Sequence, residues 1–114
     1  MASVIDSFTW IVTPAGAAGY PGPKMPYACT VLEVSSYVTA ATSATFNIEA
    51  RDTIGSAANE VLTDDMVADV TGESVTSSFN DGAIAKDQFL WLAVASISGT
   101  PGYLQVTIAF SYSV

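Results

Sequence analysis

Apolar and polar residues alternate through the last twelve positions of the chain. One parity is apolar or aromatic, with Leu104, Val106, Ile108, Phe110, Tyr112 and Val114. The other parity is mostly polar, with Tyr103, Gln105, Thr107, Ala109, Ser111 and Ser113. A period of two sustained over this length is typical of a β-strand with one buried face. This segment therefore predicts a half-buried strand.

Three more long segments resemble strands. Residues 89–98 (FLWLAVASIS) are apolar at nearly every position, which predicts a strand covered on both faces, with Trp91 in the core. The Pro- and Gly-containing residues 99–102 predict a hairpin between this strand and the last one. Residues 30–39 and 45–51 predict a second hairpin through a short loop of small residues. Their apolar faces are Leu32, Val34 and Val38 in the first strand, and Phe46, Ile48 and Ala50 in the second.

Shorter or weaker patterns complete the set. Val4, Phe8, Trp10 and Val12 alternate near the amino terminus and predict another strand. Residues 60–62 and 74–79 predict two short strands. Residues 67–70 fit a strand, although AANEVLTDDMVADV also fits one weak helix; the β-rich neighbours favour the strand. The fold expected is all-β: a single-domain, jelly-roll-like β-sandwich with seven or eight antiparallel strands.

Residues 14–26 (PAGAAGYPGPKMP) differ from the rest of the chain, with four prolines and three glycines in thirteen positions. Such a segment cannot join the interior of a sheet and predicts an extended connector. It divides the chain into residues 1–26 and a β-sandwich domain, residues 27–114. The connector is either a surface loop or part of an arm that lies on a neighbouring molecule. In the second case the aromatic residues Phe8, Trp10, Tyr20 and Tyr27 are candidates for contacting a partner.

Charge excludes several functions. The chain has 114 residues, of which 12% are charged, with a net charge of −8 and no histidine. Lys24, Arg51 and Lys86 stand singly, so neither nucleic acid nor an anionic membrane surface is an expected partner. Without histidine there is no Ser-His-Asp triad, and the single Cys29 allows neither an internal disulfide nor a zinc site. Cys29 is expected to be a small buried apolar residue.

Acidic residues gather in the middle of the chain. Asp64, Asp65, Asp69 and Glu73 fall within ten residues and are weak candidates for a calcium site. They lack the alternating spacing of an EF-hand loop, and a solvated acidic rim explains them equally well. Paired carboxylates such as Glu49 and Glu73 could serve a glycosidase, but nothing selects one pair. No catalytic residue, enzyme activity, bound metal or cofactor is therefore expected.

The polar parity of the last strand has no charge. An uncharged strand face on a domain of this size invites contact with other protein, so Tyr103, Gln105 and Thr107 are expected to lie in an interface between copies of the chain. The start of the chain lacks a basic segment and carries Asp6, so no secretory signal is predicted and cytoplasmic synthesis is expected.

Two segments carry a resemblance to known proteins. TVLEVSSYVTAATSATFNIEARD, followed by an acidic loop and by AIAKDQFLWLAVASISGTPGYLQVTIAFSYSV, resembles small β-sandwich structural proteins of tailed bacteriophages, of the head decoration (cement) type. The likeness covers about residues 27–114 and depends on strand patterning rather than on a chemical motif.

This resemblance implies a jelly-roll homotrimer in the virion, on the outer surface of the capsid, bound to the major capsid protein and stabilising the head. If residues 1–26 form an arm, a chain lacking them is expected to fold but not to bind capsids. The alternative is a tail-fibre or tail-tip module that binds a host receptor or glycan.

Overall fold

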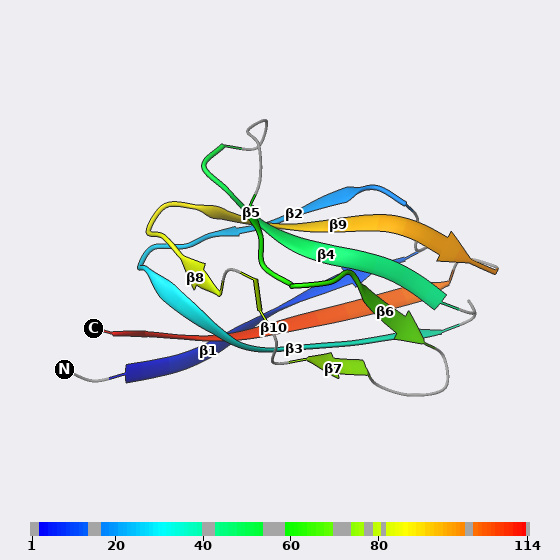
Figure 1. Ribbon diagram of the computed structural model, residues 1–114, viewed down its shortest axis with the longest axis horizontal. Helices are drawn as coiled ribbons and strands as arrows, with labels where there is room; N and C mark the ends of the chain where they lie inside the picture. Colours follow the sequence, from blue (N-terminus) through cyan, green and yellow to red (C-terminus); the bar gives the residue numbers. More distant parts are fainter. Residues whose placement is uncertain are drawn as a thin grey trace.

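The computed structural model describes residues 3–13, 17–39, 43–53, 59–69, 74–76, 79–80, 82–99 and 102–113. Within these ranges the chain forms ten β-strands and no helix (Figure 1). They are β1 (Ser3–Val12), β2 (Gly19–Lys24), β3 (Cys29–Thr39), β4 (Ser43–Arg51), β5 (Asn59–Glu60), β6 (Met66–Asp69), β7 (Ser74–Thr76), β8 (Ala83–Ile84), β9 (Phe89–Ser98) and β10 (Tyr103–Ser113). No helix among the described residues is long and apolar enough to cross a membrane.

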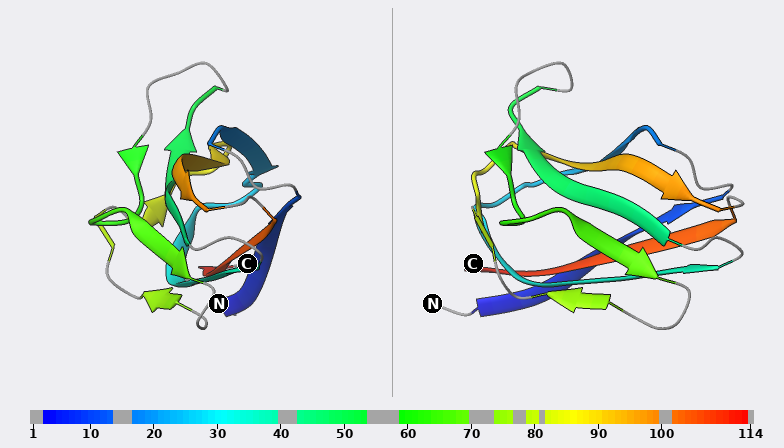
Figure 2. Two further views of the ribbon diagram at one scale, coloured as in Figure 1. Left: turned by 90° about the vertical axis from the view of Figure 1, so that its right-hand side faces the viewer. Right: turned by 45° about the vertical axis from the view of Figure 1, so that its right-hand side comes forward.

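The strands form two antiparallel sheets that pack face to face (Figure 2). The first sheet has the order β1-β10-β3-β7, and β8 also pairs with β3. The second sheet has the order β2-β9-β4-β5, and β6 also pairs with β4. The chain changes sheet at β1–β2, β2–β3, β3–β4, β6–β7, β8–β9 and β9–β10. Two four-strand sheets connected in this way, with two short additional strands, form a jelly roll, which confirms the predicted fold class.

The two predicted hairpins are wrong. β9 and β10 lie in different sheets, and so do β3 and β4. In each pair the buried faces of consecutive strands face each other across the core instead of lying side by side in one sheet. Alternation specifies only that one face of a strand is buried, and a hairpin and a connection between sheets both satisfy that requirement.

The predicted inner faces are largely correct. Phe46, Ile48 and Ala50 of β4 are buried, and so are the apolar residues of β10 from Leu104 to Phe110. The prediction for β3 fails at Leu32, which is 40% exposed, whereas Val31 and Val34 are buried. The register against β10 shifts at this point, because Ala109 pairs with Glu33 and Phe110 with Val31. Leu32 is the additional residue of a β-bulge, which the regular period of two cannot anticipate.

Strand β9 is not covered on both faces. Leu90, Leu92 and Val94 are buried in the core, while the residues between them are partly exposed. Trp91 therefore points to the outside of the second sheet, and its predicted place in the core is wrong.

The described parts of residues 1–26 are built into the sandwich instead of standing apart from it. β1 pairs with β10 along its whole length, from Ser3↔Ser113 to Val12↔Leu104. β2 lies within the predicted connector and pairs with β9 at the edge of the second sheet. An edge position suits its prolines, which cannot donate hydrogen bonds to a second neighbour. The predicted division at residue 26 is therefore not a boundary in this fold.

The remaining short segments agree in part. Met66–Asp69 is a strand. The strand predicted for residues 67–70 is therefore confirmed up to Asp69, and the alternative helix is not formed there. β5 overlaps the predicted strand 60–62 only at Glu60, and β7 covers the first three residues of the predicted strand 74–79. An isolated bridge joins Leu62 to Phe79. Residues 70 and 77–78 lie outside the described ranges.

Candidate functional site

The outer face of the first sheet is a regular surface with little charge. β1 contributes Ile5, Ser7, Thr9 and Ile11, and β10 contributes Tyr103, Gln105, Thr107, Ala109 and Ser111; β3 adds Leu32, Glu33, Ser35, Tyr37 and Thr39. Glu33 is the one ionisable carboxylate among these residues. Since the chain carries a net charge of −8, its acidic residues are concentrated elsewhere. We refer to these residues as the sheet-one face.

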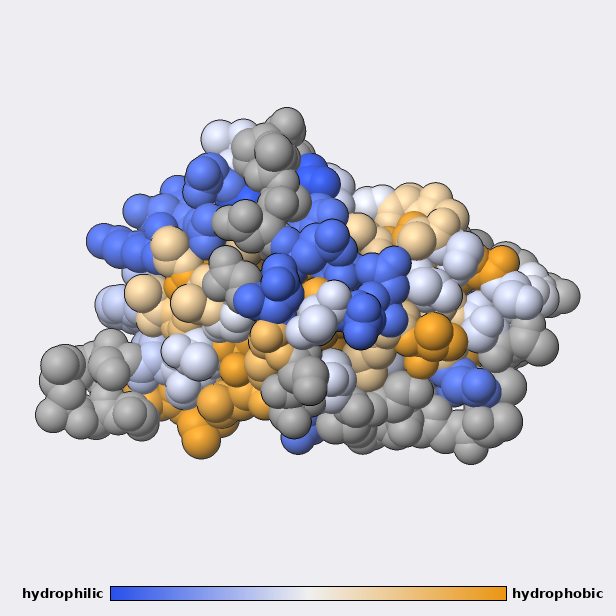
Figure 3. Space-filling model, viewed as in Figure 1, coloured by the Kyte–Doolittle hydropathy of each residue, from blue (hydrophilic) through white to orange (hydrophobic). Residues whose placement is uncertain are grey.

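Three aliphatic side chains of this face are open to solvent. Ile5 is 72% exposed, Ile11 60% and Leu32 40%, and they make up three of the five large exposed hydrophobic residues of the described chain. Figure 3 shows hydrophobic residues along the lower margin of the molecule, where Figure 1 draws β1, β3 and β10. Hydrophilic residues gather instead over the second sheet and its connections (Figure 3).

Hydrogen bonds fix the polar centre of the sheet-one face. The Tyr37 and Tyr103 hydroxyls donate to Gln105 Oε1 at 2.9 and 2.7 Å, and Thr9 Oγ1 lies 2.9 Å from Thr107 Oγ1. Partial burial and the neighbouring Tyr37 raise the pKa of the Tyr103 hydroxyl, so it stays neutral at physiological pH. The predicted interface residues Tyr103, Gln105 and Thr107 therefore lie together on a pre-ordered, uncharged surface.

The four aromatic residues predicted to contact a partner are dispersed. Trp10 is 4% exposed and belongs to the core, so its prediction as a contact residue is wrong. Phe8 packs edge-to-face on Trp10 with ring centroids 5.0 Å apart, and Tyr20 packs against the core from β2. Tyr27 is 50% exposed and stacks on Tyr112 at 5.3 Å. Of the four, Tyr27 alone is largely at the surface.

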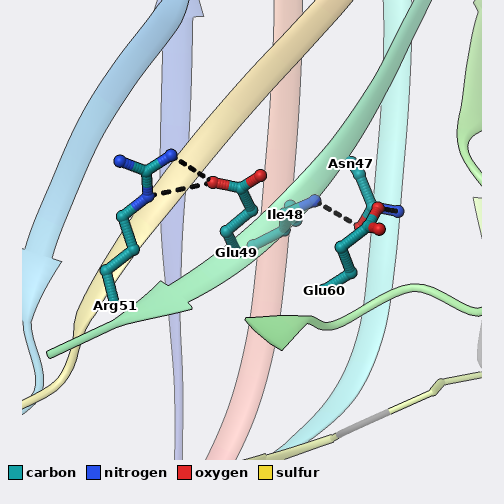
Figure 4. Close-up of polar contacts among 5 residues, drawn as sticks. All are labelled: Asn47, Ile48, Glu49, Arg51 and Glu60. Atoms are coloured by element: carbon teal, nitrogen blue, oxygen red, sulfur yellow. Dashed lines mark hydrogen bonds and ion pairs between the residues drawn. The ribbon is translucent and has the colours of Figure 1, made fainter. Parts of the chain in front are cut away.

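The second sheet carries a polar hollow of about 470 Å³ on its outer face. At its floor Asn47, which is only 5% exposed, donates through Nδ2 to Glu60 Oε2 at 2.7 Å and to Asp65 Oδ1 at 3.0 Å. Asn47 Oδ1 accepts from the backbone N–H of Ile48 (Figure 4). It also accepts from the backbone N–H of Leu62. Asn47 lies between the inward-facing Phe46 and Ile48, on the outer face of β4. The segment around Leu62 covers it and makes it a structural link.

Trp91 forms one wall of this hollow. Arg51 lies over the Trp91 ring, 4.3 Å from its centroid, and also forms an ion pair with Glu49 Oε1 at 2.6 Å (Figure 4). The ring packs so closely on Gly19 that an added Cβ there would overlap it. Arg51 and Gly19 thus both contact the Trp91 ring. The cation–π contact explains the position of Trp91 on the outer face without a bound ligand.

The weak metal candidates are not brought together. Asp65 contacts Asn47, Asp64 is exposed, and Asp69 lies on β6. Glu73 lies outside the described residues. No group of three or more potential metal ligands occurs in the part of the chain that the structure describes. Cys29 is buried in the core, as predicted, and burial raises the pKa of its thiol.

Comparison with known proteins finds likeness in structure and none in sequence. No model of a known protein family matches the chain, and no curated protein matches it in sequence. A chain in the solved structure described as the cyanophage Pam1 capsid asymmetric unit superposes with a TM-score of 0.46 at 16% identity. The match covers 97% of this chain and 82% of that chain.

Proposed function

We propose that this protein is a structural component of a phage virion, a decoration protein that binds the outer surface of the capsid through the sheet-one face. The observation that carries the proposal is the near absence of charge on that face in a chain of net charge −8. The strand pattern that resembles phage decoration proteins supports the same role.

Desolvation explains why this face suits a protein contact. Ionised side chains are costly to bury, whereas exposed aliphatic groups gain free energy when water leaves them. Ile5, Ile11 and Leu32 provide such groups, and the Tyr37–Gln105–Tyr103 hydrogen bonds already satisfy much of the polar centre. The mechanism is mechanical: area buried against neighbouring capsid subunits stabilises the assembled shell by mass action.

Copy number in purified virions tests the role. Hundreds of copies of the chain per particle, measured by densitometry of a stained gel, are expected for a decoration protein. A few copies per particle would indicate a tail component, and absence from virions would contradict both roles.

A binding experiment tests the surface. Leu32→Lys places a charge on the sheet-one face, and we expect it to reduce co-sedimentation with capsids that lack the protein. Val67→Lys is the matched control, because Val67 is similarly exposed at 46% but lies on β6 in the second sheet. Equal binding of both variants would contradict the assignment of the sheet-one face.

Glycan recognition at a tail tip is the second candidate, and the Trp91 hollow is the observation that favours it. Aromatic rings and carboxylates line many sugar sites, but here Arg51 already covers the ring. Sugar stacking would require Arg51 to move. Glycan binding that is lost in Trp91→Ala, by a chain present at a few copies per virion, would support this function over decoration.

A further inference from the structure

β1 is the longest sheet edge among the described strands, and Asp6 is its one charged residue. The opposite edge of the first sheet is formed by the short strands β7 and β8, and the second sheet ends in β5 and β6 on one side. Its other edge, β2 (GYPGPK), contains prolines, glycines and a lysine, which discourage pairing. β1 (SVIDSFTWIV) contains none of these residue types over ten positions, and Figure 2 shows it at the margin of the sandwich.

The backbone groups of alternate residues along this edge face away from β10. The Ser7 N–H donates to the Asp6 side chain at Oδ1, 2.8 Å away, instead of to β10. In an antiparallel ladder, alternate residues direct both backbone groups to the same neighbour. Residues 5, 7, 9 and 11 therefore direct their N–H and C=O groups away from β10, toward the free edge. Their side chains lie on the sheet-one face.

We propose that β1 pairs antiparallel with β1 of a second copy, about a two-fold axis through Phe8, to form a dimer with a continuous first sheet. Identical edges can pair only in registers that place residues of the same parity opposite each other, since opposite residues must both direct their backbone groups to the shared edge. The axis must therefore pass through a residue.

The exposed isoleucines select the register among those allowed. With the axis through Phe8, Ile5 lies opposite Ile11 of the second copy, and Ile11 opposite its Ile5. Ser7 lies opposite Thr9 in the same way. Both exposed isoleucines of β1 thereby gain an apolar cross-strand neighbour twice per dimer, whereas a shift of the axis by one residue places neither opposite the other.

Charge does not oppose this contact. Asp6 is the one charged residue of β1, and in this register it faces Trp10 of the second copy rather than the other Asp6. Pairing of residues 5–11 supplies roughly eight backbone hydrogen bonds, close to the number of a standard protein interface. The dimer continues the sheet-one face, with Glu33 as its one carboxylate per copy, across both copies. The family resemblance implies a trimer, so the measured mass distinguishes the two assemblies.

The test uses the full-length protein in solution, without capsids, so its outcome is separate from that of the proposed function. Light scattering on a size-exclusion column, over a concentration series, is expected to give twice the mass of one chain. Ile5→Lys and Ile11→Lys should each weaken the dimer by more than about tenfold. Both side chains are exposed, so the fold should persist, as circular dichroism can verify. Val67→Lys, on the second sheet, should leave the dimer intact.

Cross-linking tests the register. A chain that carries both Ile5→Cys and Ile11→Cys should form disulfide-linked dimers on mild oxidation, because opposite residues of paired strands lie within disulfide range. In a dimer of a chain with only one of these substitutions, the two introduced cysteines lie about 20 Å apart along the strands. Such a single variant should give no covalent dimer. A monomeric or trimeric wild-type chain, a dimer unaffected by Ile5→Lys, or cross-linking by the single variants would each overturn the proposal.

Discussion

Ser36 is a polar residue in an apolar position. It alternates with Val34 and Val38 on the inner face of β3, is 1% exposed, and its hydroxyl has no hydrogen-bond partner in the described part of the chain. An unpaired buried hydroxyl costs about 1–3 kcal/mol. We therefore expect Ser36→Ala to raise the free energy of unfolding in urea by about 1 kcal/mol. Ser35→Ala, on the outer face, should change it by less than about 0.5 kcal/mol. A destabilised Ser36→Ala would show that the hydroxyl has a partner.

Gly22 marks a close approach between the sheets. A Cβ at this position would lie 2.8 Å from Trp10 Cζ2 and 3.0 Å from the Leu90 carbonyl oxygen. Gly22→Ala should therefore lower the free energy of unfolding by about 1–3 kcal/mol, because Trp10 or the backbone must shift. At Gly82 the nearest atom to an added Cβ is 3.5 Å away, so Gly82→Ala serves as the control. Equal stability of the two variants would contradict this packing.

At the scale of elements, alternation predicted the long strands and failed where the chain departs from regular geometry. The inner residues of β4 and β10 follow directly from their pattern. Leu32 was misplaced because a bulge interrupts β3, and Trp91 because an apolar outer face resembles a buried one. In the sequence, Ile5 and Ile11 alternate with the inner residues Phe8, Trp10 and Val12, on the same face as Ser7 and Thr9. This placement was the available indication that the outer face of β1 carries apolar side chains. β2 was missed because its prolines and glycines suit an edge strand and a loop equally well.

The role of β1 and β2 in the sandwich leads to a prediction that differs from the arm expected from composition. Deleting residues 1–26 removes Trp10, Val12 and Met25 from the core and one neighbour each from β10 and β9. We expect the truncated chain to lose cooperative thermal unfolding and its near-ultraviolet circular dichroism. Cooperative unfolding of the truncated chain would instead support the hypothesis that residues 1–26 form an arm that the sandwich does not need for folding.

At the scale of the whole molecule, charge opposes association and the sheet-one face favours it. Two copies of net charge −8 repel each other, and salt screens that repulsion. The proposed dimer should therefore strengthen as sodium chloride rises from low to physiological concentration, measured by sedimentation equilibrium. An association held by charge pairs would weaken over the same range.

Side-chain alternation predicts that the chain is a β-sandwich, which residues of most long strands face the core, and that the outer face of β10 is uncharged. Each of these properties is local to one strand. In contrast, the crossing of consecutive strands between sheets, the free edge formed by β1 and the covering of Asn47 depend on how the strands pack together. Strand pairing joins residues far apart in the chain, and a local period of two is the same whichever neighbour a strand takes.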